Sequence, residues 1–415
     1  MIFGGLFGEW MGHGHHDPKT AGAFHPHAGT PTDAGAQVNE LKALQLPVVY
    51  AAIGIIADAK AQLPVDVFRR EGKHRIPQEG HYVEELLNRA PNPAMTAFTM
   101  HNTAQQHAVG WGNATLEITR NGNHEPRVIW PLLPDRTHPE PVGVTGDREV
   151  VYRTVVYGES RDLPPDRVLH VPAMGFDGLR GYSPLWMARE VAGGGLAQQR
   201  FANKFFGNDM KSGGFIEVPG KHDDEATKRI MEDINSRGGP DKHHMVKVLE
   251  QGVKYHSVTI PPEDAQFLET RQYTVEEFAR MYRIPLFMLQ SHSKDTAWGT
   301  GIAEMAMGFL TYTMAPWLKR WEQEYERKLL TEAERRAGFY VKHNVAGLLR
   351  VDAKSRAEFY EMAVSTGWMH PDEVRDLEDL NPRDDLPTQQ TSNGNADAFI
   401  LDKDGFAWRG QRLAA

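Results

Sequence analysis

Two groups of acidic residues have the composition that metal or acid–base chemistry requires. Asp223-Asp224-Glu225 places three carboxylates in a row, and Glu276-Glu277 places two side by side. Three acids that open a predicted helix are explained more simply by attraction to the positive end of that helix. Neighbours on a helix do not face one another, so Glu276 and Glu277 are expected to be solvated. Neither group is predicted to be catalytic.

A cluster of histidines near the start of the sequence raises the question of a metal site. These histidines are not spaced with acids as in a known metal motif, and His243-His244 has no evident partners. The sequence contains no cysteine, which excludes thiolate zinc sites, iron–sulfur clusters and a cysteine nucleophile. We therefore predict no metal, no cofactor and no catalytic residue. The cluster comprises His13, His15, His16, His25 and His27.

The motifs of nucleotide-binding and hydrolytic enzymes are missing from the sequence. The nearest approach to a phosphate-binding P-loop runs from Gly214 to Gly220-Lys221, with five spacers instead of four and His222 in place of serine or threonine. There is no zinc-protease, nucleophile-elbow or dinucleotide-binding motif. We predict that the protein is not an enzyme. The open alternative is a metal-dependent nuclease or hydrolase that uses Asp223, Asp224 and a nearby histidine.

The charge balance argues against tight binding of nucleic acid. The 415 residues include 46 Lys and Arg against 55 Asp and Glu, a net charge of −9, which repels a phosphate backbone. Between residues 196 and 285 there are 13 basic and 14 acidic residues, so this region is no phosphate clamp. Any contact with nucleic acid must be local and weak.

No membrane segment is predicted. The longest apolar run, 48–57, is far shorter than the roughly 20 residues that span a bilayer, and it ends at Asp58. The first residues lack the pattern of a secretory signal, so we expect a cytosolic product.

The elements that position these residues begin with an α+β region. Residues 1–38 are rich in Gly, His and Pro and predict a flexible arm. Leu46-Pro47 opens a helix. A strand with a turn at Glu71-Gly72-Lys73 follows, and then two helices separated by a Pro-containing corner. Short strands are expected at 115–119, 128–130, 149–157 and 167–171.

A second region is built on long helices. Ser183-Pro184 reads as an N-cap and first helical position of a helix that runs to about Phe206. Three glycines at 193–195 lower its stability, so close packing or bending is expected there. A small α/β insert follows, then a helix from about Pro262 to Tyr282, and then a polar loop at 290–301, of a length that is often functional.

A helix of about 28 residues follows this loop. Its apolar stripe is spaced as in a regular α-helix, Pro316 is expected to kink it, and Trp317 and Trp321 are expected to pack in the core rather than stack on bases. Helices at 353–366 and 371–379 and a polar tail complete the chain. The stripe consists of Ile302, Met305, Phe309, Thr313, Trp317, Trp321, Tyr325 and Leu329.

From residue 46 to 382, the residues of several motifs and their order resemble those of the portal protein family of tailed bacteriophages, in its shorter siphophage-type branch. Each motif is weak alone, and their shared order carries the resemblance. They are the apolar run 48–57 leading to Leu63-Pro64-Val65; Leu86-Leu87-Asn88-Arg89-Ala90-Pro91-Asn92-Pro93 with Gly112-Asn113; Val168-Leu169-His170-Val171 with Gly181-Tyr182-Ser183-Pro184; Gln266-Phe267-Leu268-Glu269-Thr270-Arg271; Ile284-Pro285; and 367–375 with Asn381-Pro382.

The resemblance implies an α+β, mostly helical portal fold assembled as a ring of twelve subunits at one capsid vertex. Double-stranded DNA would be packaged and ejected through the ring without sequence specificity. The implied regions are a flexible arm (1–45), the wing (46–182), a first stem helix (183–210), the clip (211–261), a second stem helix (262–285), a channel loop (286–303), a kinked wing helix and return (304–351), the crown (352–382) and a C-terminal tail (383–415).

The resemblance also implies partners and contact residues. The partners are copies of this chain, DNA, the terminase large subunit, the head–tail adaptor, and the major capsid and scaffold proteins, with no membrane. The protein would be assembled in the host cytoplasm and reside in the virion. The alternative is a monomeric capsid-assembly or adaptor module without a DNA channel. His292, Ser293 and Lys294 are predicted to face the channel, and Lys242, His243 and Lys247 to lie on the clip's partner surface.

Overall fold

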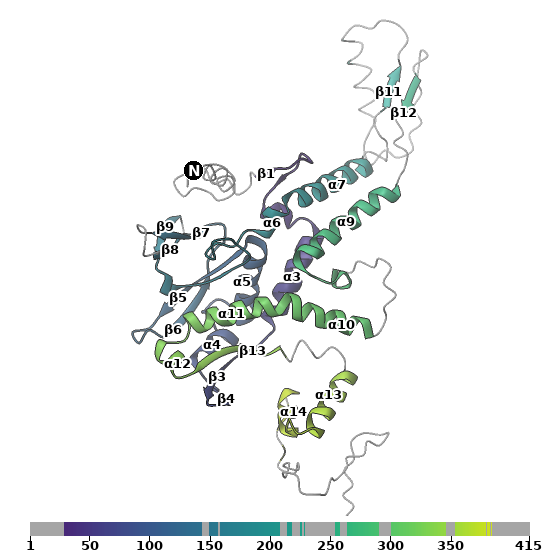
Figure 1. Cartoon of the computed structure of the whole chain (residues 1–415). Coiled ribbons are helices and arrows are strands. Elements are labelled where there is room, and N and C mark those ends of the chain that lie inside the picture. The colour runs from purple at the N-terminus through teal and green to yellow at the C-terminus, as the bar shows by residue number, and fades with distance from the viewer. Residues whose placement is uncertain are drawn as a thin grey trace, which may run out of the picture. The chain divides into compact units, whose positions relative to one another are not determined.

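The computed structural model contains two compact units (Figure 1). One unit lies within residues 1–348 and the other within 349–415. The described residues are 29–142, 149–156, 158–207, 214–217, 225, 228, 254–257, 264–289, 300–345, 353–378, 380, 381 and 383.

Two antiparallel-packed helices form the centre of the first unit. Helix α3 (Pro47–Ala61) begins with proline in its first turn, as expected from Leu46-Pro47. Helix α5 (Ala97–Trp111) is capped by the Thr96 side chain and ends at Gly112, whose φ of 82° suits glycine. The two helices pack along their lengths. The short α2 (Glu40–Ala43) and α4 (Tyr82–Asn88) precede and separate them.

The described part of the first unit also contains three antiparallel three-stranded sheets. The first has the order β13-β3-β4, the second β10-β5-β6 and the third β7-β8-β9. The strands at 115–119, 128–130, 149–157 and 167–171 are confirmed. The bounds are β3 (Val65–Glu71), β4 (His74–Pro77), β5 (Asn113–Arg120), β6 (Pro126–Pro131), β7 (Thr137–Val142), β8 (Glu149–Val156), β9 (Glu159–Leu163), the 3-10 turn η2 (Pro165–Arg167), β10 (Val168–Pro172) and β13 (Phe339–His343).

Residues 29–45 are more ordered than the arm predicted for 1–45. Strands β1 (Thr30–Pro31) and β2 (Gln37–Val38) pair, and Thr32, Ala36 and Val38 are buried. The Thr32 hydroxyl donates to the Ala36 carbonyl at 2.7 Å. The local sequence, rich in Gly and Thr, does not predict this hairpin, because the hairpin is stabilised by packing on a helix that is distant in the sequence.

That helix belongs to the pair α7 (Arg189–Gly207) and α9 (Asp264–Tyr282). Ser183 caps α6 (Pro184–Met187) as expected, but Ala188 leaves helical geometry, so the predicted single helix is two helices. The close packing predicted for the glycines is confirmed at two of three positions. A Cβ on Gly193 would lie 2.4 Å from the Thr32 hydroxyl, and one on Gly195 would lie 3.3 Å from Leu46 and Thr274, whereas Gly194 is open.

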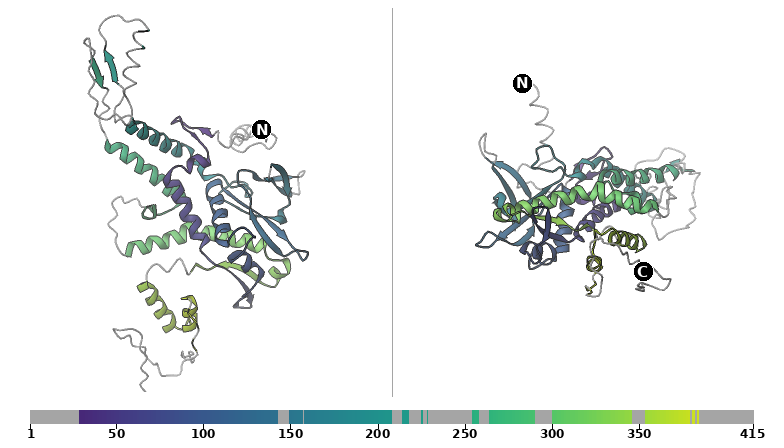
Figure 2. Two further views of the ribbon diagram at one scale, coloured as in Figure 1. Left: turned by 180° about the vertical axis from the view of Figure 1, so that it is seen from behind. Right: turned by 60° about the horizontal axis from the view of Figure 1, so that its bottom comes forward.

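The long helix expected after the polar loop has three parts. They are α10 (Thr300–Gly308), the π-helical turn η4 (Phe309–Met314) and α11 (Ala315–Lys328). The kink predicted at Pro316 is replaced by this π turn just before the proline, and α10 and α11 follow nearly one line in Figures 1 and 2. The predicted stripe is largely confirmed, because Thr313 is buried and Trp317 packs, partly buried, against the core. The π turn also brings Met314, and after it Leu318, into the core.

The described residues of the first unit form two large apolar clusters and a small one. One large cluster gathers residues of α3, α7, α9 and η4, and the other lies between the sheets, α5 and α11. The small cluster consists of Leu132, Tyr152, Leu163 and Val168. Trp321 is fully buried in the second cluster, which confirms that it packs in the core. The short helices η3 (Leu286–Leu289) and α12 (Glu332–Arg336) connect these parts.

The described part of the second unit is a pair of short helices. Helices α13 (Ala353–Ser365) and α14 (Pro371–Leu377) match the two helices expected there. The Phe359 ring meets the Trp368 ring edge-on at 5.3 Å, and the Tyr360 hydroxyl donates to Glu378 at 2.9 Å. Across both units, no helix among the described residues is long and apolar enough to cross a membrane.

Candidate pore-lining helices and the cleft at their base

Helices α7 and α9 run side by side in opposite directions, away from the mixed core (Figures 1 and 2). Beyond their far ends, β11 (Gly214–Glu217) pairs with β12 (Lys254–Ser257). The small-residue surface of α7 lets the two helices approach closely, since Gly195 lies opposite Thr274. This arrangement makes an extended helical pair on a compact base.

Burial along the pair falls off with distance from the base. Near the base, Ala192, Leu196, Phe278 and Tyr282 are buried. Farther out, no described side chain is buried at 197–204 or at 271–277. Phe201 is 52% exposed and Tyr273 is 57% exposed, a large apolar area for a surface that a single chain leaves open. The outer pair is therefore a surface suited to covering by another molecule.

The end of α9 is fixed by its backbone. Arg283 has a φ of 56°, and Ile284 N donates to Ala279 O at 2.9 Å while Arg283 N donates to Arg280 O at 3.2 Å. These two hydrogen bonds form a Schellman motif, with arginine at the left-handed position where glycine is usual. Pro285 cannot continue the helix. The predicted end of this helix at Tyr282 is confirmed.

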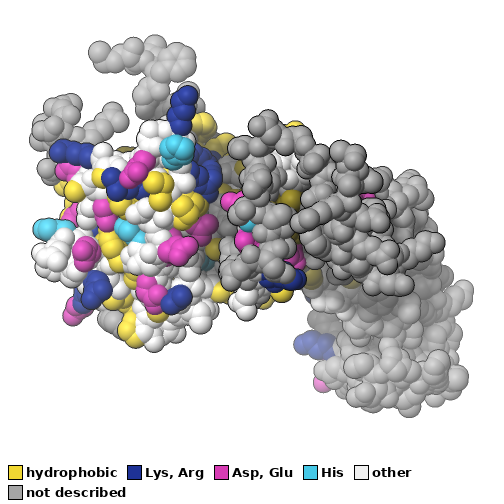
Figure 3. All heavy atoms as spheres, turned by 90° about the horizontal axis from the view of Figure 1, so that it is seen from below, with side chains coloured by type: hydrophobic (Ala, Val, Ile, Leu, Met, Phe, Trp, Pro, Cys, Tyr) yellow, Lys and Arg dark blue, Asp and Glu magenta, His cyan; other side chains and the backbone are white. Residues whose placement is uncertain are grey.

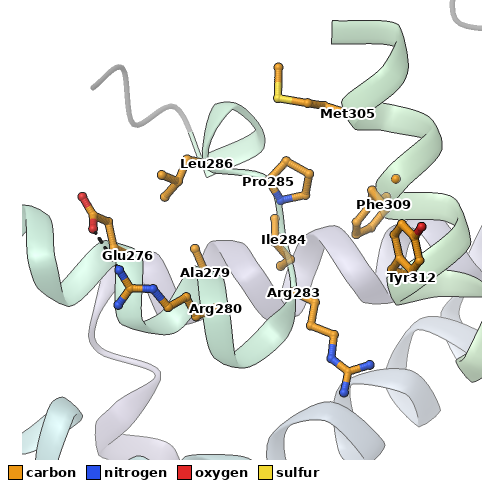
Figure 4. Close-up of a pocket in the computed structure, with 11 residues that line it drawn as sticks. Glu276, Ala279, Arg280, Arg283, Ile284, Pro285, Leu286, Met305, Phe309 and Tyr312 are labelled. Atoms are coloured by element: carbon orange, nitrogen blue, oxygen red, sulfur yellow. Dashed lines mark hydrogen bonds and ion pairs between the residues drawn. The ribbon is translucent and has the colours of Figure 1, made fainter. Parts of the chain in front are cut away.

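A shallow cleft of about 490 Å³ lies where the end of α9, η3 and the α10–η4 segment meet. Figure 4 shows Met305 and Phe309 on one side, with Ile284 and Pro285 opposite. The Thr313 hydroxyl donates to the Arg283 carbonyl and so joins η4 to the end of α9. The remaining lining residues are Glu276, Ala279, Arg280, Arg283, Leu286, Gly308 and Tyr312.

The charges around the cleft are mostly paired or partly desolvated. Arg280 forms ion pairs with both Glu276 and Glu277, so these acids are an ion-pair group, as Figure 4 shows for Glu276. Burial, and then repulsion from Arg283, lower the pKa of Arg320, which lies over the Trp317 ring at 4.8 Å. On the face seen in Figure 3, basic and acidic side chains are interspersed. Such a surface holds a polyanion weakly.

No group of three or more potential metal ligands lies together among the described residues. Of the acids at 223–225, only Glu225 is described, and it is exposed on a helical residue.

The sequence-predicted site residues lie outside the described residues. This applies to the channel residues His292, Ser293 and Lys294 and to the clip residues Lys242, His243 and Lys247. Sequence reasoning missed the cleft and its Thr313–Arg283 contact. The nearest signal in the sequence is Pro316, because a proline inside a helical pattern disturbs the helix in the turn before it.

Comparisons with known proteins agree with this geometry. A family model described as phage portal protein matches residues 47–379. A probable portal protein of Streptomyces phage phiC31 is 30% identical over 400 residues, which cover 92% of this chain and 86% of that protein. The portal protein of Enterobacteria phage HK97 is 29% identical over 352 residues, 84% of this chain and 81% of that protein.

Solved structures share the fold. A chain from the neck of an empty gene transfer agent particle has a TM-score of 0.58 at 22% identity, and covers 83% of this chain and 95% of its own. A chain from the native particle's neck, computed with C12 symmetry, has a TM-score of 0.55 at 21% identity over 88% and 98%. An HK97 family portal protein from Corynebacterium diphtheriae has a TM-score of 0.56 at 16% identity over 76% and 97%.

The matched span includes α3, both helices of the extended pair, the cleft and the two helices of the second unit. More than half of the chain is matched, and relatives align over most of their own length. This chain is a member of the phage portal protein family.

Proposed function

We propose that copies of this chain close into a ring and that α7 and α9 line its central pore, through which double-stranded DNA passes. The observation that carries the proposal is the outer helical pair, which buries no described side chain at 197–204 or 271–277. A cyclic ring uses two different faces of each subunit, so surfaces left open in one chain are covered in the assembly. The C12 symmetry of the similar neck structure supports a twelvefold ring.

The charge of the chain suits passage of DNA. Each phosphate that a protein neutralises adds affinity through counterion release, so a strongly basic pore would hold DNA in place. The net charge of −9, with 13 basic and 14 acidic residues between 196 and 285, avoids this. The pore would guide DNA without gripping it.

The regional assignments follow from the helical pair. In the proposal, the helices at 183–210 and 262–285 form the stem, and residues 211–261, which include β11 and β12, form the clip. Residues 46–182 and 304–351 form the wing, 352–382 the crown, and 286–303 the channel loop. His292, Ser293 and Lys294 would face DNA, because their polar segment follows the second stem helix directly.

The proposed partners follow from the same assignment. The sequence has no P-loop, so a separate terminase large subunit would supply the energy of packaging. Lys242, His243 and Lys247 would contact that motor and later the head–tail adaptor. The rim of the ring would meet the major capsid and scaffold proteins, and the protein would reside in the virion after assembly in the host cytoplasm.

Images of the purified chain test the ring directly. We expect negative-stain class averages to show annuli with a central hole, and native mass measurement to give several hundred kilodaltons. A stable monomer that supports capsid assembly would instead favour the adaptor alternative. Divalent-metal-dependent cleavage of DNA by a monomer or dimer would favour an enzyme.

A charge reversal tests the channel residues. We expect Lys294→Glu to reduce DNA packaging or retention while rings still form, because twelve added carboxylates would repel DNA inside the pore. Lys73→Glu is the matched control, since Lys73 lies exposed in the turn between β3 and β4. Equal packaging by both variants would contradict the placement of Lys294 in the channel.

A further inference from the structure

The π-helical turn η4 inserts one extra residue into an otherwise regular helix. The Ala315 amide donates to the Leu310 carbonyl, five residues back instead of four. The buried surface of the helix widens at this turn, because Thr313 and Met314, four and five residues after Phe309, are both buried. Single π turns are rare and are frequent at functional sites.

Pro316 explains why the extra residue lies at this position. In a regular helix, the proline ring would clash with the Tyr312 carbonyl, and the missing amide would leave that carbonyl without a donor. A wider turn before the proline moves the carbonyl away from the ring. The wider turn also presents the Thr313 hydroxyl to the Arg283 carbonyl, where Thr313 is buried.

The two sides of η4 are held very differently. On the α11 side, Trp321 Nε1 donates to Gln105 at 2.6 Å, and the buried Lys60 donates to the Tyr325 hydroxyl at 3.0 Å. Lys60 also contacts His101 Nδ1 and lies 4.4 Å from the Trp321 ring centroid. These contacts fix α11 against α3 and α5.

On the α10 side, none of the described side chains from Glu304 to Gly308 is buried. The open cleft lies against this part of the helix, and a Cβ on Gly308 would meet nothing within 4 Å. Met305 and Phe309 carry the stripe into the cleft wall, and of the two only Phe309 is buried. A change of register on this side therefore breaks few contacts.

We propose that η4 is a register hinge, a place where the two parts of the helix can change their rotation relative to one another. The position of the π turn moves toward the N-terminus of α10 while α11 stays fixed. At each step, one backbone hydrogen bond that spans five residues is replaced by one that spans four, so the number of backbone hydrogen bonds is nearly conserved. Every residue passed turns by about 100° and advances by about 1.5 Å relative to α11. Phe309 then leaves the cleft wall, and the cleft has two shapes.

This hinge is a property of one chain, and its test does not require the proposed pore. Hydrogen exchange of the intact protein, followed by mass spectrometry, reports backbone opening along the long helix. We expect amides at 304–314 to exchange at least about a hundredfold faster than those at 318–326, because migration breaks each bond transiently. Similar protection of the two segments would overturn the proposal.

Deleting Tyr312 should remove the extra residue and lock the register. Tyr312 is 71% exposed, so its loss removes no core packing. We expect protection at 304–314 to rise at least about tenfold in the deletion variant. Tyr312→Ala, which keeps the residue count, is the control and should leave exchange unchanged. An unchanged deletion variant would overturn the hinge.

A second variant covers the case in which the deletion does not fold. Pro316 is exposed, and Pro316→Ala restores the amide that a regular helix requires. We expect slower exchange at 309–314 in this variant, and faster or equal exchange would count against the hinge. Ring formation, measured separately by native mass, distinguishes a failed hinge from a failed ring.

Discussion

Helices α10 and α11 are two halves of one long helix, yet only one half is anchored in the core. Helix α11 buries Leu318, Trp321 and Tyr325, and its acids reach two strands. Glu324 accepts from the His170 amide and Glu322 from the His343 amide, both at 3.0 Å. Helix α10 buries none of its described side chains before Phe309.

The difference between α10 and α11 indicates that some segments are stabilised within one chain, whereas others leave surface open for contact with another molecule. Tertiary packing supplies most of the stability of a helix in a protein, so α11 is complete within a single chain. Helix α10 and the outer parts of α7 and α9 expose surface that one chain does not cover. The anchored half sets the fold, and the open half is available for contact and movement.

The largest expected effect comes from removing Trp321, which anchors α11 in the core. Trp321→Ala should lower the free energy of unfolding by about 3–5 kcal/mol, because it leaves a cavity and an unpaired Gln105. Met307→Ala on α10 should change it by less than about 0.5 kcal/mol, since Met307 is half exposed. Urea unfolding at one protein concentration measures both, and equal losses would remove the contrast between the halves.

Acid should weaken the core that holds α11. Burial lowers the pKa of His170 to about 3 and of His107 to about 4, from 6.5 in the unfolded chain. Their contribution is complete above pH 6.5 and falls by about 1.4 kcal/mol per pH unit for each group as the pH drops toward the folded pKa. Denaturant unfolding from pH 7 to 4.5 measures this slope.

The controls for the acid prediction use single histidines. His170→Asn should flatten the slope by about 1.4 kcal/mol per pH unit. His74→Asn, at an exposed position of β4, should leave it as it is. A His170→Asn slope equal to that of the parent would contradict the assignment of acid sensitivity to the buried ring.

Replacing the buried amine should stabilise the anchor. Burial lowers the pKa of Lys60 well below 10.5, and its partners are neutral groups. We expect Lys60→Met to raise the free energy of unfolding at pH 7, because an apolar side chain of similar size avoids the cost of burying the amine. The Tyr325 hydroxyl keeps His101 Nδ1 as a partner at 3.2 Å.

The same variant changes the response to alkali. The unfolded chain binds the Lys60 proton up to pH 10.5 while the folded chain releases it earlier, so the parent gains stability as the pH rises from 7 toward 10. Lys60→Met should lose this gain. If the variant is less stable than the parent at pH 7, the contacts of the amine contribute more to the free energy of unfolding than its burial costs.

The smallest expected effect is at the end of α9. Arg283→Gly should stabilise the protein by about 0.5–1 kcal/mol, since glycine adopts a positive φ without strain. His124→Gly, at a φ of 63° between β5 and β6, is the matched control. A larger gain in stability at position 283 than at 124 would reveal the repulsion between Arg283 and Arg320. A loss of stability at position 283 would mean that the arginine side chain contributes contacts.

Much of the fold was predictable because its signals are local. Pro47 and Ser183 mark helix starts, and Tyr282 a helix end, at the expected places. Caps and prolines act within one turn, so the sequence alone reveals them.

The missed elements depend on distant partners. Strand β13 pairs with β3 from the other end of the unit, with Val341 opposite Val67. Strand β7 contains Pro139 and Pro141, which argue against a strand unless it lies at a sheet edge, as β7 does. The π turn was missed because a uniform helical period was assumed across Phe309 and Met314. The channel and clip residues remain predictions.

A density map of the purified ring, at a resolution that shows side chains, tests the central claim that neighbouring copies complete the outer helical pair. We predict that Phe201 and Tyr273, both about half exposed in one chain, are covered by the adjacent subunit around a central hole. A closed ring in which both aromatic rings remain in solvent, or a chain that forms no ring, would contradict the account.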